Sequence, residues 1–348
     1  MHSFSSRLIR WQRQHGRHGL PWQGADAYRV WLSEIMLQQT QVATVLPYYQ
    51  RFTTAFPTVA ALAAASQEQV LAHWSGLGYY ARGRNLHRAA QIIAEKYHGE
   101  FPRQYEQILE LPGIGRSSAA AICALAYHER RAILDGNVKR VLARHCGIEG
   151  PPSSKAVEVQ LWQQAETLLP QRDVASYIQA QMDMGATLCT RSKPKCGECP
   201  VQANCVACQT NRVHELPTPR PRKEVPERRS TFLLLLHDNN ILLEKRVPSG
   251  IWGGLWCPPQ LEDGQGGCVA DYLQRSGVVV SEKIELAEFT HTFTHFKLHI
   301  TPMLLRVAHK PLQAQQPGSV WLDVDEALQA AIPTPVRRIL RELPKNHP

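Results

Sequence analysis

The chain has 348 residues, a length that suggests two domains, and its 43% of hydrophobic residues excludes a disordered polymer. The formal net charge of +9 favours a polyanionic partner. Residues 1–229 carry 28 basic and 18 acidic side chains, a net charge of +10, whereas residues 230–348 carry 11 and 12, a net charge of −1. We therefore expect the two parts to have different roles.

Several classes of protein are disfavoured at once. No apolar run reaches the roughly 18 residues that a membrane helix needs, and the run at residues 231–236 has the length of a strand. The first eleven residues lack the apolar segment of a signal peptide, so we expect a cytoplasmic protein with no membrane partner. Nine cysteines, an odd number in a large chain, argue against a disulfide scaffold.

From Ser3 to Thr187 the apolar residues recur mostly at helical spacing, as between Tyr28 and Leu37. The same pattern predicts helices over residues 86–97, 117–127, 138–146 and 157–168. Prolines are expected to separate the helices, at Pro47, Pro57, Pro102, Pro112, Pro151 and Pro152. The first part is therefore predicted to be all-α.

Residues 216–229 alternate prolines with basic residues, which predicts a stiff, extended linker. It is either a plain connector or one that also touches a phosphate backbone. Residues 231–237 and 241–245 then predict two strands joined by a turn at Asp238. Further strands are expected at 278–280, 290–295 and 298–305, with helices at 271–275 and 325–331. Residues 230–348 are thus predicted to form an α+β domain.

Five of the nine cysteines lie between Cys189 and Cys208, a clustering typical of a metal site. The spacing Cys189-x6-Cys196-x2-Cys199-x5-Cys205 supplies four thiolates that can hold a [4Fe–4S] cluster or a tetrahedral zinc ion. A zinc site would use Cys208 and omit Cys189, and its two cysteine pairs would be unusually close together. The spacing therefore favours iron–sulfur, in a structural or a redox role.

Residues 111–117, Leu-Pro-Gly-Ile-Gly-Arg-Ser, lie between two predicted helices. Gly113 and Gly115 permit a tight turn, and their N–H groups beside the next helix can bind an anion. The pattern is typical of a helix-hairpin-helix motif, which holds a DNA phosphate without reading sequence. The alternative is an ordinary turn between helices. We expect DNA to contact Gly113, Gly115 and Ser117.

Two carboxylates stand out. Glu34 lies in the most apolar predicted helix, where desolvation would raise its pKa and suit it to general acid catalysis. Taken alone, it is better explained as a residue on the exposed edge of that helix. Asp135, in Leu134-Asp-Gly-Asn-Val, taken alone is an N-cap for the helix that follows. Their presence in one chain with a DNA-binding hairpin and a metal loop makes a catalytic pair the stronger hypothesis.

Four motifs occur in order before the cysteine loop: residues 33–42 (SEIMLQQTQV), 76–82 (GLGYYAR), 111–117 (LPGIGRS) and 134–140 (LDGNVKR). From about Arg7 to its C-terminus, the chain resembles the A/G-specific adenine DNA glycosylases of bacteria. Its first part also resembles endonuclease III and the wider helix-hairpin-helix family. The resemblance implies a nucleoid-associated monomer that excises adenine opposite 8-oxoguanine or guanine in double-stranded DNA and so initiates base excision repair.

The resemblance also assigns roles to single residues. Glu34 matches the acid that protonates adenine N7, and Asp135 matches the carboxylate that stabilises the oxocarbenium-like sugar or traps it transiently. The adenine must first be rotated out of the duplex. Trp22 and Gln179 match positions of the adenine pocket. Four further residues match positions that probe 8-oxoguanine or wedge the base stack: Gln39, Thr40, Leu77 and Tyr79. Without that role, Gln39 and Thr40 would be exposed helix residues, and Leu77 and Tyr79 would be core or loop residues.

Ser117 occupies a position where bifunctional relatives carry a lysine that forms a Schiff base and cleaves the strand. A serine cannot do this, so the resemblance implies a monofunctional glycosylase. Lys139, near Asp135 in the sequence, could still form an adventitious Schiff base with the product.

Residues 230–348 resemble the Nudix-like domain of this family. Residues 250–271 include Ile-Trp-Gly-Gly-Leu-Trp-Cys-Pro-Pro and lack the row of carboxylates that a Nudix hydrolase needs, so lesion recognition is expected instead of hydrolysis. The segment Phe293, Thr294 and His295 matches the loop that inspects 8-oxoguanine, with Thr294 where the family often has serine. Otherwise it is an ordinary turn at the end of a strand.

Three alternatives remain. An endonuclease III-like pyrimidine-lesion glycosylase with lyase activity is disfavoured by Ser117 and by the second domain. A non-catalytic iron–sulfur DNA-binding module would not need Glu34. A nucleotide pyrophosphatase would need the absent carboxylate row. The predicted boundaries are residues 1–215 for the helix-hairpin-helix glycosylase domain, 216–229 for the linker and 230–348 for the Nudix-like domain.

Overall fold

The computed structural model describes residues 3–220, 224–262, 268–310 and 318–343. The chain divides into two compact units, each considered by itself below. The helical unit consists of Met1–Ala63 and Arg88–Arg222, and the mixed unit of Ala64–His87 and Lys223–Pro348. The division after residue 222 falls within the predicted linker, of which residues 221–223 lie outside the described part. The segment Ala64–His87 packs with the C-terminal residues, although the sequence pattern placed it within residues 1–215.

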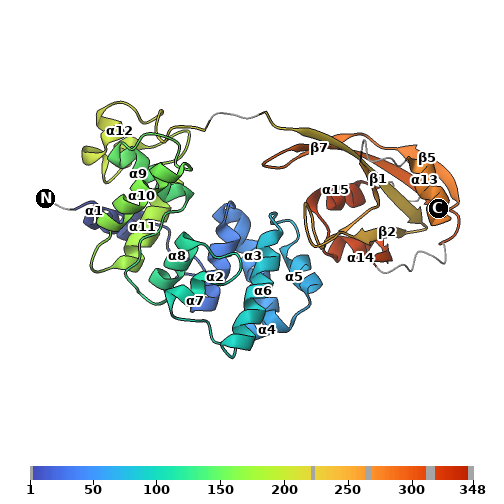
Figure 1. Cartoon of the computed structure of the whole chain (residues 1–348), viewed down its shortest axis with the longest axis horizontal. Helices are drawn as coiled ribbons and strands as arrows, with labels where there is room; N and C mark the ends of the chain where they lie inside the picture. The colour runs from blue at the N-terminus through green and yellow to red at the C-terminus, as the bar shows by residue number, and fades with distance from the viewer. Residues whose placement is uncertain (1–2, 221–223, 263–267, 311–317, 344–348) are drawn as a thin grey trace. The chain divides into compact units, whose positions relative to one another are not determined.

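Helices account for the regular structure of residues 3–220, as the spacing of apolar residues predicts (Figure 1). They are α1 (Phe4–His15), α2 (Ala27–Leu37), α3 (Val42–Ala55), α4 (Val59–Ala64), α5 (Gln67–Trp74), α6 (Ala81–Lys96), α7 (Tyr105–Leu109), α8 (Arg116–Ala126), α9 (Gly136–Cys146), α10 (Lys155–Thr167), α11 (Val174–Thr187) and α12 (Val206–Gln209), with 3₁₀ turns at Cys196–Glu198 and Gln202–Asn204.

One proline does not behave as expected. Pro47 lies inside α3 instead of ending a helix, so the prediction that it separates two helices is wrong. A proline in a helix interior costs about 3 kcal/mol because it removes one backbone hydrogen bond and crowds the preceding turn. The helix continues because Val45, Tyr49 and Phe52 are buried along one face of it, and that burial outweighs the local cost.

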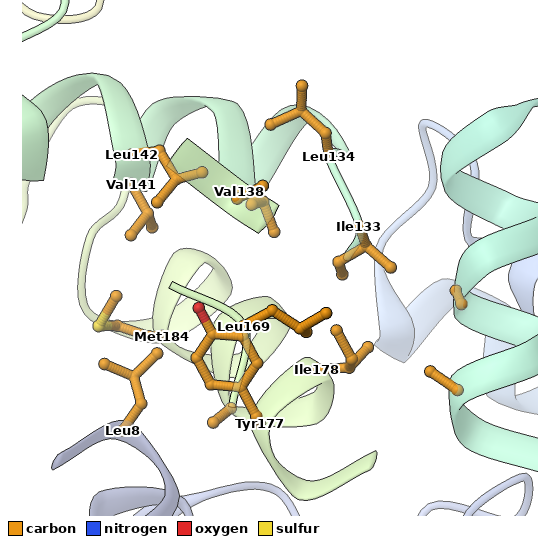
Figure 2. Packing of buried hydrophobic residues seen from close by; sticks show 14 of the residues in the cluster. Leu8, Ile133, Leu134, Val138, Val141, Leu142, Leu169, Tyr177, Ile178 and Met184 are labelled. Atoms are coloured by element: carbon orange, nitrogen blue, oxygen red, sulfur yellow. The ribbon is translucent and has the colours of Figure 1, made fainter. Parts of the chain in front are cut away.

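The core of the helical unit lies between α1, α9 and α11, with side chains from α8 and α10 packed around it. Figure 2 shows Leu8, Val138, Leu142, Tyr177 and Met184 pointing toward one another from these elements. The helix α9 ends at Gly147, whose φ of 68° is left-handed. A Cβ there would lie 2.6 Å from Val206 Cγ1, so α12 can pack this closely only against a glycine.

The mixed unit contains a mixed β-sheet in the strand order β3-β2-β1-β7-β5 (Figure 1). Strand β4 also pairs with β1, β6 with β7 and β8 with β2. The strands are β1 (Glu227–His237), β2 (Asn240–Lys245), β3 (Trp256–Cys257), β4 (Gln260–Glu262), β5 (Val280–Glu285), β6 (Phe289–Thr292), β7 (Lys297–Val307) and β8 (Ser319–Asp323), with helices α13 (Val269–Ser276), α14 (Val324–Gln329) and α15 (Thr334–Glu342).

The centre of this sheet is the parallel pair of β1 and β7, in register from Glu227 opposite Lys297 to Leu236 opposite Arg306. Leu233 and Leu235 pack against α13 on one face, and Phe232 and Leu234 are fully buried on the other. A strand covered on both faces is continuously apolar, which explains the unbroken run at residues 231–236. The predicted hairpin of β1 and β2 is confirmed, but β1 begins at Glu227, inside the predicted linker.

Among the described residues no helix combines the length and the apolar character needed to cross a membrane.

Removal of a core side chain should destabilise the helical unit. Leu142 is fully buried in α9, and Leu142→Ala is expected to lower the free energy of unfolding by about 2–5 kcal/mol, because it leaves a cavity. Leu109 in α7 is 39% exposed, so Leu109→Ala should change it by less than about 0.5 kcal/mol. Chemical denaturation followed by circular dichroism measures both, and equal losses would contradict the assigned core.

Candidate active site

The carboxyl group of Glu34 lies on α2 among buried neighbours, including Ser33 and Ile35. Part of its side chain still meets solvent, but the packed atoms around the carboxyl group remove most of its hydration. This desolvation, reinforced by the negative charge of Asp135, raises the pKa of Glu34 to about 8. Glu34 therefore carries a proton at neutral pH, as a general acid must.

Asp135 is the N-cap of α9, and its Oδ1 accepts a hydrogen bond from the backbone N–H of Val138 at 2.7 Å. Burial raises the pKa of Asp135, while that N–H and the positive charge of Arg140 oppose the rise. The negative charge that Asp135 carries when ionised contributes to the raised pKa of Glu34. The structure thus brings into electrostatic contact one carboxyl group from α2 and one from the N-cap of α9.

Arg140 holds the start of α9 in place. Its Nε donates to the carbonyl oxygen of Cys189 at 2.8 Å, and its Nη2 donates to Asn137 Oδ1 and to the carbonyl oxygen of Gly185. A Cβ on Gly185 would lie 2.6 Å from Asn137 Cβ, so α9 and α11 approach here as closely as a glycine permits. These contacts fix Asp135 relative to the cysteine loop.

The hydroxyl of Ser117 accepts the backbone N–H of Leu134 at 2.9 Å, directly before Asp135. Lys139, one helical turn after Asp135, forms an ion pair with Glu158 of α10. Its Nζ donates to Glu158 Oε1 at 2.5 Å, which directs the amine toward α10.

Gln179 belongs to a buried hydrogen-bond network. Its Nε2 donates to Asp183 Oδ1 at 2.8 Å, one turn further along α11. Asp183, only 1% exposed, also accepts the backbone N–H of Arg17 at 2.9 Å and the Arg17 guanidinium at 2.7 Å. The network attaches Arg17, in the segment that precedes Trp22, to α11, which carries Gln179. Trp22 itself packs edge-on against Tyr49, with ring centroids 5.1 Å apart.

The sequence pattern had not singled out Arg17 or Asp183. A usable signal was present, because an aspartate four residues after Gln179 lies on the same buried face of α11 and needs a cationic partner.

The hairpin between α7 and α8 has the expected geometry. Gly113 has a left-handed φ of 82°, and Gly115 is the N-cap of α8. No atom lies within 4 Å of a Cβ built on Gly115, so the space in front of this backbone is open to a phosphate.

The residues expected to probe 8-oxoguanine are divided between the units. Gln39 and Thr40 belong to the helical unit, and Leu77, Tyr79 and the segment 293–295 to the mixed unit. Gln39 and Tyr79 have left-handed φ values of 57° and 48°, and such strain gathers at binding sites. Leu77 is buried and Tyr79 is 44% exposed. Thr294 and His295 are exposed at the tip between β6 and β7, where Phe293 N–H donates to the carbonyl oxygen of Phe296.

The cysteine loop surrounds one cavity. Its lining includes Cys189, Cys196, Cys199 and Cys205, with Cys208 beside them. Arg144, only 3% exposed, braces the loop: its guanidinium donates to the carbonyl oxygens of Thr190, Arg191 and Leu216 and lies 3.4 Å from Cys189 Sγ. Within the described ranges no three ligand side chains converge closely enough for one metal ion. Four thiols that line one cavity are the donor set that an iron–sulfur cluster requires.

Three known families match successive parts of the chain. Residues 32–167 match the HhH-GPD superfamily of base excision DNA repair proteins, residues 189–205 the iron-sulfur binding domain of endonuclease III, and residues 231–342 the NUDIX domain. The predicted fold class is confirmed: a helical domain with a helix-hairpin-helix motif, followed by a Nudix-like α+β domain.

Individual relatives extend over nearly the whole chain. The adenine DNA glycosylase of Buchnera aphidicola (Acyrthosiphon pisum) is 37% identical over 99% of this chain and 98% of its own length. That of Homo sapiens is 34% identical over 97% of this chain and 73% of its own length. A solved thermostable thymine-DNA glycosylase is similar at 27% identity and a TM-score of 0.54, covering 60% of this chain and 95% of its own. The chain belongs to the adenine DNA glycosylase family, DNA repair enzymes that act by removing adenine.

Proposed function

We propose that this chain hydrolyses the N-glycosidic bond of adenine paired with 8-oxoguanine or guanine in duplex DNA, and leaves the strand uncut. The observation that carries the proposal is the carboxyl pair, in which burial and the charge of Asp135 raise the pKa of Glu34 to about 8, while the N-cap bond to Val138 opposes the rise in the pKa of Asp135. Departure of a purine needs both functions at once, an acid for the base and a negative charge for the sugar.

The roles follow from the chemistry of the bond. Once adenine is outside the helix, Glu34 donates its proton to N7, and the base becomes a neutral leaving group. As the bond between C1′ and the base lengthens, positive charge develops on the sugar, and Asp135 stabilises it. Water then adds to C1′ and gives an abasic site.

The amide of Gln179 supports the choice of adenine. Because its Nε2 donates to Asp183, its Oε1 is presented as an acceptor on the other side of the amide. Adenine offers a donor in its exocyclic amino group, and guanine and thymine present a carbonyl oxygen at the corresponding position. Trp22 contributes an aromatic surface to the pocket.

We assign inspection of the opposite base to Gln39, Thr40, Tyr79 and the segment 293–295. The exposed hydroxyl of Thr294 supports this assignment, because it can exchange a hydrogen bond with the altered edge of 8-oxoguanine.

Neither Ser117 nor Lys139 offers a free amine for attack on the sugar, which supports a reaction without strand cleavage. Ser117 carries no amine, and its hydroxyl is bonded to the backbone of Leu134. Lys139 is held by Glu158 on α10, which limits its reaction with the sugar.

We propose a [4Fe–4S] cluster as the resident group of the cysteine loop. Cys189, Cys196, Cys199 and Cys205 would hold it, since these four lie within the matched iron–sulfur segment and Cys208 lies beyond it. The cluster would supply four covalent cross-links, which fix the loop whose Cys189 carbonyl binds Arg140 and so support α9.

An end-labelled duplex tests the reaction and its product. Incubation with an A:8-oxoguanine pair should give cleavage at adenine only after alkali treatment, because the enzyme leaves an abasic site. An A:G duplex should behave in the same way and an A:T duplex should remain intact. Cleavage without alkali, or cleavage at an oxidised pyrimidine, would favour an endonuclease III-like glycosylase with lyase activity.

The pH dependence should report the carboxyl pair. Glu34 acts in its protonated form, so the single-turnover rate of excision should fall as pH rises through about 8. Asp135 acts in its ionised form, so its protonation should lower the rate on the acidic side. Glu34→Gln should abolish excision and retain DNA binding, while Glu95→Gln, at an exposed position, should change neither. A Glu34→Gln variant with normal excision would refute the assignment.

Two cysteine variants separate the possible metal sites. Cys189→Ser should lose iron and the visible absorption of the cluster, whereas Cys208→Ser should retain both. A zinc site formed by the two Cys-x2-Cys pairs would give the reverse pattern, measured as zinc content of the purified variants.

A further inference from the structure

The mixed unit contains two loops that the proposed function brings to the lesion, residues 76–79 and residues 293–295. The turn 246–255 contains residues 252–255 (Trp-Gly-Gly-Leu), which are found where a Nudix hydrolase would begin its carboxylate row. This segment has no part in the glycosylase chemistry described above. Its contacts reach toward both loops.

The turn 246–255 is closed by its own backbone. Arg246 N–H donates to the carbonyl oxygen of Leu255 at 2.9 Å, and Leu255 N–H donates to that of Trp252 at 3.0 Å. Trp252 has a left-handed φ of 56°, unusual for so large a side chain. A Cβ on Gly253 would lie 2.6 Å from the carbonyl oxygen of Pro248, so only glycine permits this path. The turn is therefore defined by backbone contacts as well as by side-chain packing.

On one side the turn supports the recognition loop. The Trp252 side chain is buried, with its ring 5.4 Å from that of Phe293 and 5.8 Å from that of His291. Phe293 in turn stacks on Phe296, at 4.5 Å and 18°. The base of the loop that carries Thr294 thus rests on Trp252.

On the other side the turn binds α6. Arg84 Nη1 donates to the carbonyl oxygen of Gly253 at 2.7 Å. In the first turn of the same helix, Arg82 Nη2 donates to the carbonyl oxygens of Leu77 and Gly78, and its guanidinium lies 5.4 Å from the centre of the Tyr79 ring. The helix that binds the turn therefore also shapes loop 76–79.

Further bonds hold α5 and the start of α6 against the C-terminal residues. Glu68 accepts the indole N–H of Trp256 at 2.5 Å and the ammonium group of Lys245 at 2.9 Å. The hydroxyl of Ser75 donates to the carbonyl oxygen of Ile332 at 2.6 Å and accepts from Arg337. The two loops are thus parts of one connected body.

We propose that turn 246–255 couples the two loops, so that contact of residues 293–295 with the lesion positions loop 76–79 in the base stack. This inference rests on the proposed recognition of 8-oxoguanine. Arg84 is a positioning residue, because it transmits the constraint from Gly253 to α6 without touching the DNA base. The turn at the position of the Nudix carboxylate row would then connect the conformation of residues 293–295 to that of loop 76–79.

The test is the ratio of single-turnover excision rates on A:8-oxoguanine and A:G duplexes. Arg84→Met removes the hydrogen bond to Gly253 and should reduce this ratio about fivefold, the effect of one lost hydrogen bond. Arg84→Lys keeps a donor and should restore most of the ratio. Arg88→Met, at an exposed position of the same helix, removes the same charge and should leave the ratio unchanged. The rate on A:G should not change in any of the three variants, and circular dichroism should show that each of them is folded.

A double-mutant cycle with Phe293→Ala completes the test. If the loops are coupled, Phe293→Ala should lower the ratio, and Arg84→Met should lower it little further in that background. Fully additive effects, or an unchanged ratio in Arg84→Met, would overturn the coupling and leave lesion recognition by residues 293–295 intact. An unchanged ratio in both Phe293→Ala and Thr294→Ala would overturn the proposed recognition itself, and the coupling with it.

Discussion

The proposed chemistry of the helical unit depends on one constraint, the desolvation of the carboxyl groups of Glu34 and Asp135. Glu34 keeps its proton at neutral pH because its carboxyl group is desolvated and because Asp135 is charged nearby. Neither condition is local to the sequence around Glu34. One depends on the packing of α2, and the other depends on α9 starting at the right place.

Much of the surrounding structure fixes that starting place. The N-cap bond to Val138 sets the first turn of α9, and Arg140 attaches this turn to α11 and to the carbonyl group of Cys189. One turn further on, Arg144 binds three more backbone carbonyl groups around the cysteine loop. The loop is therefore connected to Asp135 through hydrogen bonds along one face of a single helix. Its contribution to catalysis can be architectural without any change of oxidation state.

The sequence predicted those parts of the fold that depend on neighbouring residues. Helical spacing located the helices α8, α9 and α10 to within about two residues, and the turn at Asp238 placed the hairpin of β1 and β2. It missed α15, where only one face of a short helix is apolar. It also missed the continuation of α3 through Pro47, because the burial that compensates the proline comes from other helices.

The candidate site shows the same division. Its individual residues are predicted from short motifs, since the proposed chemistry demands particular side chains at particular places. The partners that position them are not, because they are distant in the sequence. Arg17 and Asp183 are 166 residues apart, and the strand β7 that pairs with β1 lies about 70 residues further along the chain. The grouping of Ala64–His87 with the C-terminal residues likewise depends on contacts that no local pattern contains.

The hydrogen bond between Ser117 and Leu134 bears on how enzymes of this architecture can change their reaction. A lysine at position 117 would bring the amine that a lyase needs, but it would also remove the acceptor that holds the chain just before Asp135. The same substitution would therefore add an amine and weaken the support of residue 134 in one step.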